Sequence, residues 1–246
     1  MHSFYIDKKG VVGEKATLPK EEAKHALKVL RLGVGDEVGA MDGCGGRFTA
    51  VIEAVSGDSV TLNLTGELPD NEAPVAITLY QGLPKADKLD FIVQKITELG
   101  AVRLVPVKME RCVVKLDAKD AQKRRERLEK IAHEATKQCK RAAMPEILEA
   151  MTWKQALQDM KNCDLVIVPW EEARGTRVKD VYAQHPDAKR IGIVIGPEGG
   201  MSEGEIEAMR EAGVLPVTLG PRILRAETAA VTSVAMAMTL WGDLWD

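Results

Sequence analysis

Two similar stretches near the C-terminus, IGIVIGPEGG at 191–200 and LPVTLGPRILRAET at 215–228, decide the fold. In each, an apolar run rich in β-branched residues stops at a Gly-Pro pair. A buried parallel strand that ends in a sharp loop has this pattern. We therefore expect two parallel strands here, with their ends side by side.

The first of these loops leads into a helix. Ser202 can cap the helix start and Glu205 completes a capping box, so we expect a helix over 203–212 that stops at Gly213. The loop glycines permit close main-chain approach to a nucleoside-type ligand, although an ordinary strand-to-helix turn has a similar composition. A phosphate-binding P-loop fits less well, because Glu205 stands where that motif needs Lys.

Together, IGPEGG and the later LGPRILRAETA resemble one family closely. The chain looks like the SPOUT-superfamily methyltransferases that modify uracil N3 in small-subunit ribosomal RNA, and the resemblance spans nearly its whole length. It implies methyl transfer from S-adenosylmethionine to N3 of a specific uridine in 16S ribosomal RNA, of the type at position 1498. It also implies a C-terminal trefoil knot, with the cofactor among the knotted loops.

The resemblance places the cofactor on both glycine loops. Ile223 is expected to pack on the adenine. The main-chain contacts are expected from Gly196, Gly199, Gly200, Leu219, Gly220 and Leu224.

The reaction itself suggests two catalytic side chains. Uracil N3–H is a weak acid, so the site must stabilise negative charge on the base and give the proton somewhere to go. Arg225 and Glu198 are our candidates, one to stabilise charge on a uracil oxygen or a phosphate, the other to orient the base or accept its proton. A structural ion pair of Arg225 with Glu198 or Glu227 is the competing interpretation.

Length and composition indicate an ordinary globular protein. The 246 residues are 45% hydrophobic and 29% charged, enough to bury a sizeable core in one large domain or two. The N-terminal residues lack the apolar run of a signal peptide, and the most apolar segment, 229–241, is shorter than the ~20 residues that span a bilayer. We expect a cytoplasmic protein with no membrane contact. The four Cys and four His are scattered, so we expect neither a disulfide framework nor a metal site.

The net charge of −3 conceals a basic segment. From Lys85 to Arg141 the chain has 16 Lys or Arg against nine Asp or Glu. Such an asymmetry suggests a footprint for a nucleic-acid backbone, with a solvated helix face of mixed charge as the alternative. The expected partner is 16S ribosomal RNA within the small ribosomal subunit.

The first 70 residues indicate a small β domain, because short alternating runs are separated by glycine turns. In the resembled family this region is a PUA-like β-barrel, a fold that binds RNA in other proteins. His25, Lys28 and Arg31 match its pattern, and we expect them to contact RNA; a partly buried helix position is the alternative for His25. The expected strands are 3–6, 37–41, 48–55 and 59–64.

A polar segment with two prolines, 67–74, is typical of an interdomain linker. We expect the PUA-like domain over 1–70 and the SPOUT methyltransferase domain over 75–246. Strands and helices alternate in the second domain, which predicts an α/β fold with a parallel sheet covered on both faces. The expected strands 75–81, 102–107 and 163–169 join the two above, with helices over 86–99, 118–141 and 226–244.

Family-like residues continue in the second domain. The resemblance assigns RNA contacts to Lys85, Lys88, Arg111 and Arg141, although Cys112 departs from the small hydroxyl residue usual after Arg111. Trp170 directly follows a predicted buried strand, so it either borders the cofactor or belongs to the core.

The last helix is apolar on all sides, which fits a helix packed against its own sheet and a partner subunit. The resemblance implies a homodimer, and a central core helix in a monomer is the alternative. Two other functions remain open. A non-catalytic ribosome-assembly factor would hold RNA without binding the cofactor, and a phosphoryl-transfer enzyme would need the loop Lys and a metal-binding carboxylate cluster that the sequence lacks.

Overall fold

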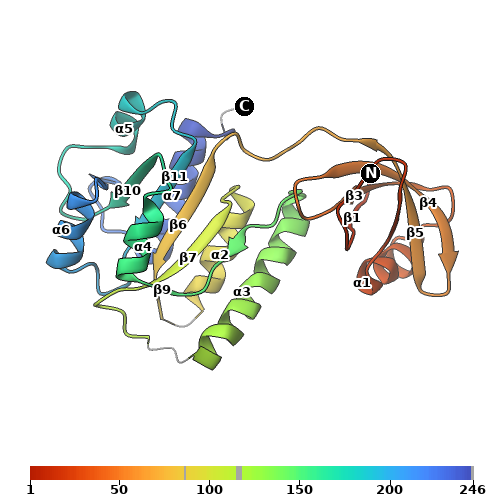
Figure 1. Ribbon diagram of the computed structural model, residues 1–246, viewed down its shortest axis with the longest axis horizontal. Helices are drawn as coiled ribbons and strands as arrows, with labels where there is room; N and C mark the ends of the chain where they lie inside the picture. The colour runs from red at the N-terminus through yellow and green to blue at the C-terminus, as the bar shows by residue number, and fades with distance from the viewer. Residues whose placement is uncertain (86, 115–117, 245–246) are drawn as a thin grey trace. The chain divides into compact units, whose positions relative to one another are not determined.

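The computed structural model describes residues 1–85, 87–114 and 118–244, and it divides into two compact units (Figure 1). Unit 1 combines Met1–Glu72 with Thr136–Met144, and unit 2 combines Ala73–Ala135 with Pro145–Asp246. The domain bounds 1–70 and 75–246 stay a prediction. The structural units differ from them mainly at 136–144, a short segment that packs with the N-terminal residues.

Unit 1 is built on one five-stranded sheet in the order β1-β3-β4-β5-β2, in which only the β1–β3 pair is parallel. The described strands form an open half-barrel, because β1 and β2 lie at opposite ends of this order. Alternate apolar residues fill the core. The elements are β1 (Ser3–Tyr5), β2 (Lys15–Thr17), α1 (Lys20–Lys24), the π-helical turn η1 (His25–Val29), β3 (Glu37–Met41), β4 (Arg47–Ser56) and β5 (Ser59–Glu67).

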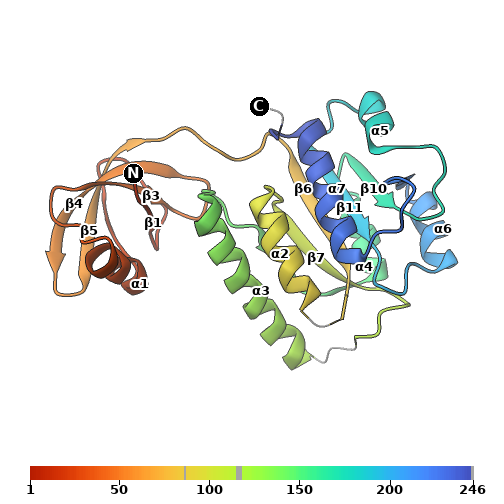
Figure 2. The same cartoon turned by 180° about the vertical axis from the view of Figure 1, so that it is seen from behind.

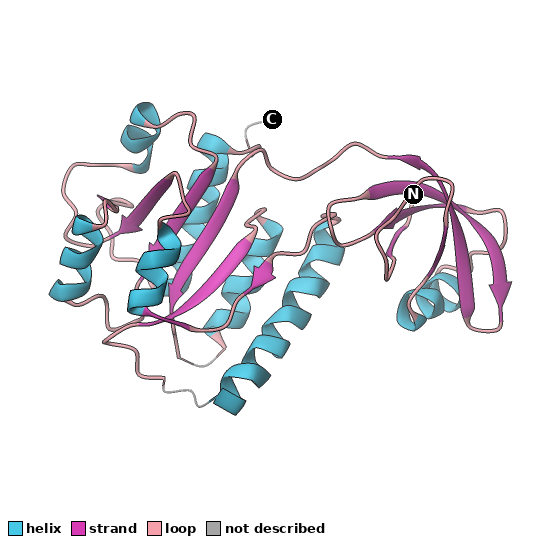
Figure 3. Cartoon of the chain, in the orientation of Figure 1, coloured by secondary structure: helices cyan, strands magenta, loops and turns pink. Residues whose placement is uncertain are grey.

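Unit 2 is built on a seven-stranded sheet in which every pairing is parallel (Figure 3). The predicted parallel α/β sheet is therefore confirmed. The order is β12-β10-β11-β6-β7-β8, and β9 also pairs with β7. The strands are β6 (Ala76–Gly82), β7 (Arg103–Lys108), β8 (Glu146–Ile147), β9 (Met151–Thr152), β10 (Leu165–Pro169), β11 (Arg190–Ile195) and β12 (Leu215–Val217).

Helices cover both faces of this sheet (Figure 2). Two separate apolar clusters fill the spaces between helices and sheet. One face carries α2 (Lys88–Glu98), α3 (Ala118–Cys139), α5 (Val178–Gln184) and α7 (Ala226–Trp241), and the other carries α4 (Trp153–Met160) and α6 (Glu203–Glu211).

The predicted helices of this unit are confirmed within a few residues, and α6 begins at the expected capping box of Ser202 and Glu205. Ala86, the expected first residue of the second domain's first helix, lies outside the described residues. Across the described part of the chain, no helix combines the length and the apolar character needed to cross a membrane.

The two glycine-loop strands are not neighbours, so the expectation that their ends lie side by side is wrong. β10 lies between them and pairs with β11 on one side and β12 on the other. A signal for this was present in the sequence: β12 contains Pro216, which cannot donate a ladder hydrogen bond, and such strands belong at the edge of a sheet.

Candidate functional site

Five loops meet at one edge of the parallel sheet, because parallel strands all end on the same side. The loops after β11 and β12 are the two glycine loops, and the end of β10 lies between them. The remaining two loops follow β6 and β7. The site therefore takes its residues from segments far apart in the sequence, namely 83–85, 109–114, 170–177, 196–202 and 218–225.

The first glycine loop, 196–202, turns tightly. The N–H of Gly200 donates to Pro197 O at 2.9 Å, and Gly200 has φ +72°. Gly199 lies against Arg111, since a Cβ added there would be 3.1 Å from both the Cβ and the carbonyl O of Arg111. Arg111 Nη1 also donates to Gly199 O at 3.3 Å. The structure thus joins this loop to the loop after β7.

Glu205 provides a second link between these two loops. Its buried carboxylate accepts from Ser202 N–H at 2.9 Å, which completes the predicted capping box. The other oxygen accepts from the backbone N–H of Glu110 at 2.8 Å. The capping pattern revealed the first contact only, because the partner of the second is 95 residues away.

Gln81, at the end of β6, is fully buried beside the first glycine loop. Its Nε2 donates to Gly82 O at 3.0 Å and more weakly to Gly196 O at 3.4 Å. Its Oε1 is buried without a hydrogen-bond donor among the described residues. Gln81 therefore supports the start of the loop through Gly196. The family resemblance includes Gln81, but no sequence pattern indicates this contact.

Lys88, in the first turn of α2, contacts two carboxylates. Its Nζ lies 3.0 Å from Glu198 Oε1, in the first glycine loop, and 3.3 Å from Glu227 Oε2, in the first turn of α7. The hydrogen bond from Lys88 to Glu198 contributes most to raising the pKa of the Lys88 ammonium. The structure places this lysine in an ion-pair cluster, and the RNA contact that the resemblance implies for it stays a prediction.

Glu198 also accepts from the backbone N–H of Lys85 at 3.0 Å. Partial burial acts to raise the pKa of the Glu198 carboxyl. Hydrogen bonds from its own backbone N–H, from Lys88 and from Lys85 outweigh burial, so the net shift is downward. At neutral pH Glu198 is a carboxylate and a weak base.

The second glycine loop, 218–225, is more open. Gly220 has φ +109°, and its N–H donates to Thr218 Oγ1 at 3.2 Å. The backbone N–H of Thr218 donates to Thr176 O at 2.9 Å, which joins this loop to the one after β10. Ile223 is 83% exposed, whereas Leu219 and Leu224 are half-buried. The loop thus offers apolar side chains and free main chain next to β10.

Arg225 precedes the first residue of α7 and is exposed. Within the described part of the chain, the structure gives its guanidinium no ion pair, because Lys88 takes both Glu198 and Glu227. The competing interpretation of a structural Arg225 ion pair is therefore wrong. Arg225 remains available to a ligand.

Trp170 follows β10 between the two glycine loops. Its backbone N–H donates to Val217 O at 3.1 Å, and the guanidinium carbon of Arg210 lies 5.3 Å from the centroid of its ring. Trp170 is half-buried and packs against the cluster under α4 and α6. The structure therefore supports the core role for this side chain, with Arg210 covering it.

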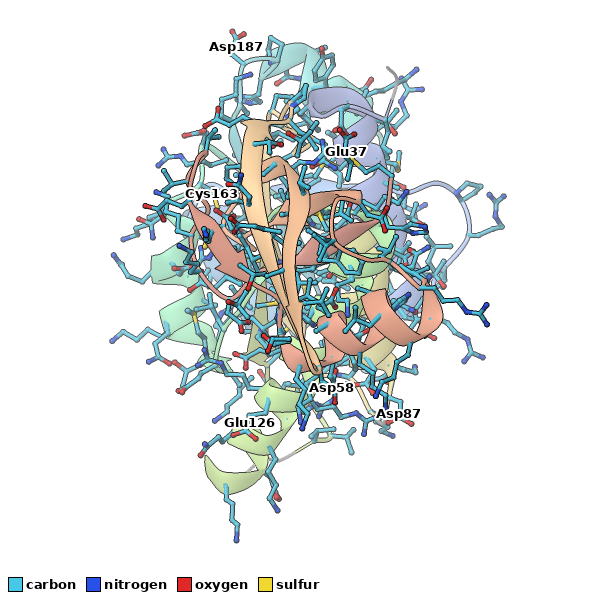
Figure 4. All side chains as sticks on the ribbon, turned by 90° about the vertical axis from the view of Figure 1, so that its right-hand side faces the viewer. Glu37, Asp58, Asp87, Glu126, Cys163 and Asp187 are labelled. Carbon is cyan, nitrogen blue, oxygen red and sulfur yellow. The ribbon has the colours of Figure 1, made fainter. Side chains whose placement is uncertain are left out.

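The residues expected to contact RNA divide into two groups. His25, Lys28 and Arg31 are exposed on unit 1, and Lys28 Nζ lies 3.2 Å from Oδ1 of Asp58, labelled at the β4–β5 turn in Figure 4. Arg141 is 5% exposed, and its guanidinium bonds to Glu72, so its geometry argues against direct contact with RNA.

Lys85 and Arg111 are exposed at the strand-end loops of unit 2. Over residues 1–85, 87–114 and 118–244, no group of three His, Cys, Asp or Glu side chains is placed to hold a metal ion.

The loops and sheet are those of a known class of RNA-modifying enzymes. Residues 71–238 match the family described as the RNA methyltransferase domain, and residues 18–65 match the RNA methyltransferase PUA domain. The expected fold class, a SPOUT methyltransferase domain with an N-terminal PUA-like domain, is confirmed. The chain belongs to the ribosomal RNA small subunit methyltransferase E family.

Three relatives illustrate the similarity. The Bacillus subtilis ribosomal RNA small subunit methyltransferase E is 37% identical over 220 residues, which cover 87% of this chain and 86% of the relative. A Neisseria gonorrhoeae structure of the same name, bound to S-adenosyl methionine, has a TM-score of 0.86 and 35% identity over 99% of both chains. A Legionella pneumophila methyltransferase with bound cofactor SAM has a TM-score of 0.83 and 32% identity over 98% of both chains.

Proposed function

We propose that this protein transfers a methyl group from S-adenosylmethionine to N3 of a specific uridine in the 16S ribosomal RNA of the small subunit. The observation that carries the proposal is the pair of glycine loops on either side of the end of β10, in a chain whose relatives bind S-adenosylmethionine in this fold. Family membership favours this enzyme over the non-catalytic assembly factor.

The loops have the properties that such a cofactor needs. Gly220 has a backbone conformation that residues with side chains rarely adopt, and a Cβ at Gly199 would press on Arg111 at 3.1 Å, so both loops present main chain. Exposed Ile223 and half-buried Leu219 and Leu224 offer an apolar surface for the adenine. When bound, S-adenosylmethionine supplies an electrophilic methyl group.

Two side chains act on the base in this proposal. The S–CH3 bond breaks as the N3–CH3 bond forms, N3 gives its proton to solvent water, and the exposed Arg225 stabilises the negative charge that develops on uracil. The lowered pKa of Glu198 makes it a poor proton acceptor, so we assign it to orienting the base through a hydrogen bond. Of the expected RNA contacts we retain His25, Lys28, Arg31, Lys85 and Arg111, all of which are exposed.

The experiment uses labelled S-adenosylmethionine and small ribosomal subunits from cells that lack the activity. The RNA is digested afterwards and the labelled nucleoside is identified. Label in N3-methyluridine at one position is the expected result. Label in a different nucleoside would reject the proposed position, and RNA binding without any label would favour the assembly factor.

The trefoil knot, the homodimer and the cytoplasmic location stay predictions. The backbone bridge between Arg177 and Thr218 is compatible with a chain that passes close to the loop after β10. Light scattering on the purified protein tests the homodimer, because a mass of one 26.9 kDa chain would contradict it.

A further inference from the structure

The ion-pair cluster of Lys88, Glu198 and Glu227 joins three elements that frame the proposed cofactor site. We propose that Lys88 is a positioning residue that holds the two glycine loops in the arrangement that binds S-adenosylmethionine. The inference rests on the cofactor assignment in the proposed function and adds a residue that acts on cofactor affinity through its two partners.

The contacts place Lys88 between the loops. Glu198 belongs to the first glycine loop, and Glu227 lies two residues after the second, in the first turn of α7. Both carboxylates contact the same ammonium nitrogen, at 3.0 and 3.3 Å. Because β11 and β12 are separated by β10, no backbone hydrogen bond in the described part of the chain links their loops directly, and Lys88 supplies a link from α2.

Partial burial makes this cluster stronger than a surface ion pair. The exposed fractions of the side chains are 28% for Lys88, 27% for Glu198 and 19% for Glu227. Glu227 Oε2 is inaccessible to solvent and has no hydrogen bond among the described residues, so the ion pair is its compensation. An inaccessible carboxylate oxygen without a cation is unfavourable, so without Lys88 the start of α7 would move to hydrate Glu227.

The cluster carries a net charge of −1 with Lys88 and −2 without it. Two carboxylates that lose their shared cation repel each other. We therefore expect removal of Lys88 to push Glu198 and Glu227 apart and, with them, the two glycine loops. That movement weakens cofactor binding, and it also lowers the methylation rate because Glu198 orients the base in the proposed function.

The test measures S-adenosylmethionine affinity by calorimetry on the full-length protein, without RNA. Lys88→Met keeps the apolar stem and removes the charge, and we expect about tenfold weaker binding, or about 1.4 kcal/mol. Lys88→Arg keeps the cation and should stay within about threefold of wild type. In methylation assays, Lys88→Met should raise KM for the cofactor by a larger factor than it lowers kcat, which falls through the displacement of Glu198 from the base.

Lys95→Met is the matched control. Lys95 is also on α2, is similarly exposed at 33%, and pairs with Glu98 at 2.9 Å on the same helix, so its loss should leave cofactor affinity unchanged. A second variant tests the charge argument. Glu227→Gln added to Lys88→Met removes the unpaired carboxylate, and the double variant should bind the cofactor more tightly than Lys88→Met alone.

Wild-type affinity in Lys88→Met would overturn the inference, as would equal losses in Lys88→Met and Lys95→Met. Weaker RNA binding with unchanged cofactor affinity would return Lys88 to the RNA contacts. These outcomes are independent of the uridine. If the wild type binds S-adenosylmethionine but methylates no ribosomal uridine, the proposed function fails, whereas the affinity series still decides the role of Lys88.

Discussion

Among single residues, Arg225 carries the chemistry we assign to the site. Arg225→Ala should lower kcat about 100-fold, the usual scale for removing one group that stabilises developing charge. The melting temperature should stay unchanged, because the side chain is exposed and has no ion pair in the described part of the chain. Single-turnover methylation and thermal unfolding measure the two effects.

Arg222 gives the matched control for this variant. It is another exposed arginine in the same loop, so it tests whether the rate depends on Arg225 itself or on the total charge of the loop. Arg222→Ala should keep the rate within a few-fold of wild type. A full rate in Arg225→Ala would remove this residue from the mechanism.

Gly199 and Gly204 form a second matched pair. A Cβ at Gly199 meets Arg111 at 3.1 Å, whereas a Cβ at Gly204 meets nothing within 4 Å. Gly199→Ala should therefore shift the first glycine loop and weaken cofactor binding about tenfold, or about 1.4 kcal/mol. Gly204→Ala, inside α6, should leave binding unchanged and stabilise the helix by about 0.5–1 kcal/mol. Calorimetry and chemical denaturation decide, and equal cofactor affinity in both variants would contradict the loop assignment.

Asp164 predicts a pH dependence of stability. Hydrogen bonds from the Arg190 side chain, then from its backbone, lower the pKa of the Asp164 carboxyl from 3.8 to about 2. Because the pKa is lower in the folded state, the contribution is present above about pH 4 and is lost as pH falls towards 2. Asp164→Asn should remove this dependence of the free energy of unfolding on pH between about 4 and 2, as measured by chemical denaturation at several pH values. Asp187→Asn, at a site without an ion pair in the described residues, should leave it unchanged.

Among the elements, α6 depends on a cap that also supports the site. Ser202→Ala should destabilise the protein by about 1 kcal/mol. Thr152 provides the same capping box for α4, at a distance of 3.4 Å from Gln155 N against 3.3 Å for Ser202 and Glu205 N. Thr152→Ala should therefore cost a similar free energy of unfolding, but only Ser202→Ala should weaken cofactor binding. Losses of affinity of equal size would show that α6 has no special relation to the first glycine loop.

The sequence was sufficient to predict elements whose signals are local. A Gly-Pro pair marked the loop that follows β11 and another marked the loop that follows β12, and Ser202 with Glu205 marked the start of α6. The strand order was not local information. The position of β10 between β11 and β12 depends on pairing across the sheet. The three residues of β2 were too few to show the alternation of apolar and polar residues that predicts a strand.

The site was predictable to the same extent. The glycine loops and Arg225 could be proposed from the sequence because they lie in the motifs that carry the family resemblance, and their roles stay proposals. The roles of Lys88, Gln81 and Glu205 depend on partners at least 95 residues away in the chain, and no spacing rule reports such contacts. For the same reason Arg141 was assigned to RNA, although Glu72 holds it in unit 1.

At the scale of the whole molecule, Glu72 holds two distant parts of unit 1 together. Its carboxylate accepts from Arg141 Nε at 3.0 Å and from the N–H groups of Ala142 and Ala143 at 3.1 and 3.0 Å. Glu72→Gln should destabilise unit 1 by about 3 kcal/mol, because the guanidinium of Arg141 is buried. Chemical denaturation followed by far-UV circular dichroism measures the loss.

Glu14→Gln is the control for this prediction. Glu14 pairs with Lys8 at 2.9 Å on the surface of the same unit, with a side chain that is 54% exposed. Its loss should cost less than about 1 kcal/mol. A similar small effect for Glu72→Gln would mean that the buried pair contributes no more than a surface one.

The chain crosses between the two units three times, after residues 72, 135 and 144. A gene fragment that ends near codon 72 therefore encodes an incomplete first unit, which lacks residues 136–144. The rest of the gene encodes the second unit together with residues 136–144, whose packing partners are missing from that fragment. Exchanging the first unit between relatives therefore requires replacing two separate segments of the gene rather than one. A single protease cut at 67–70 should leave both fragments associated, so that sizing shows one particle while a denaturing gel shows two bands.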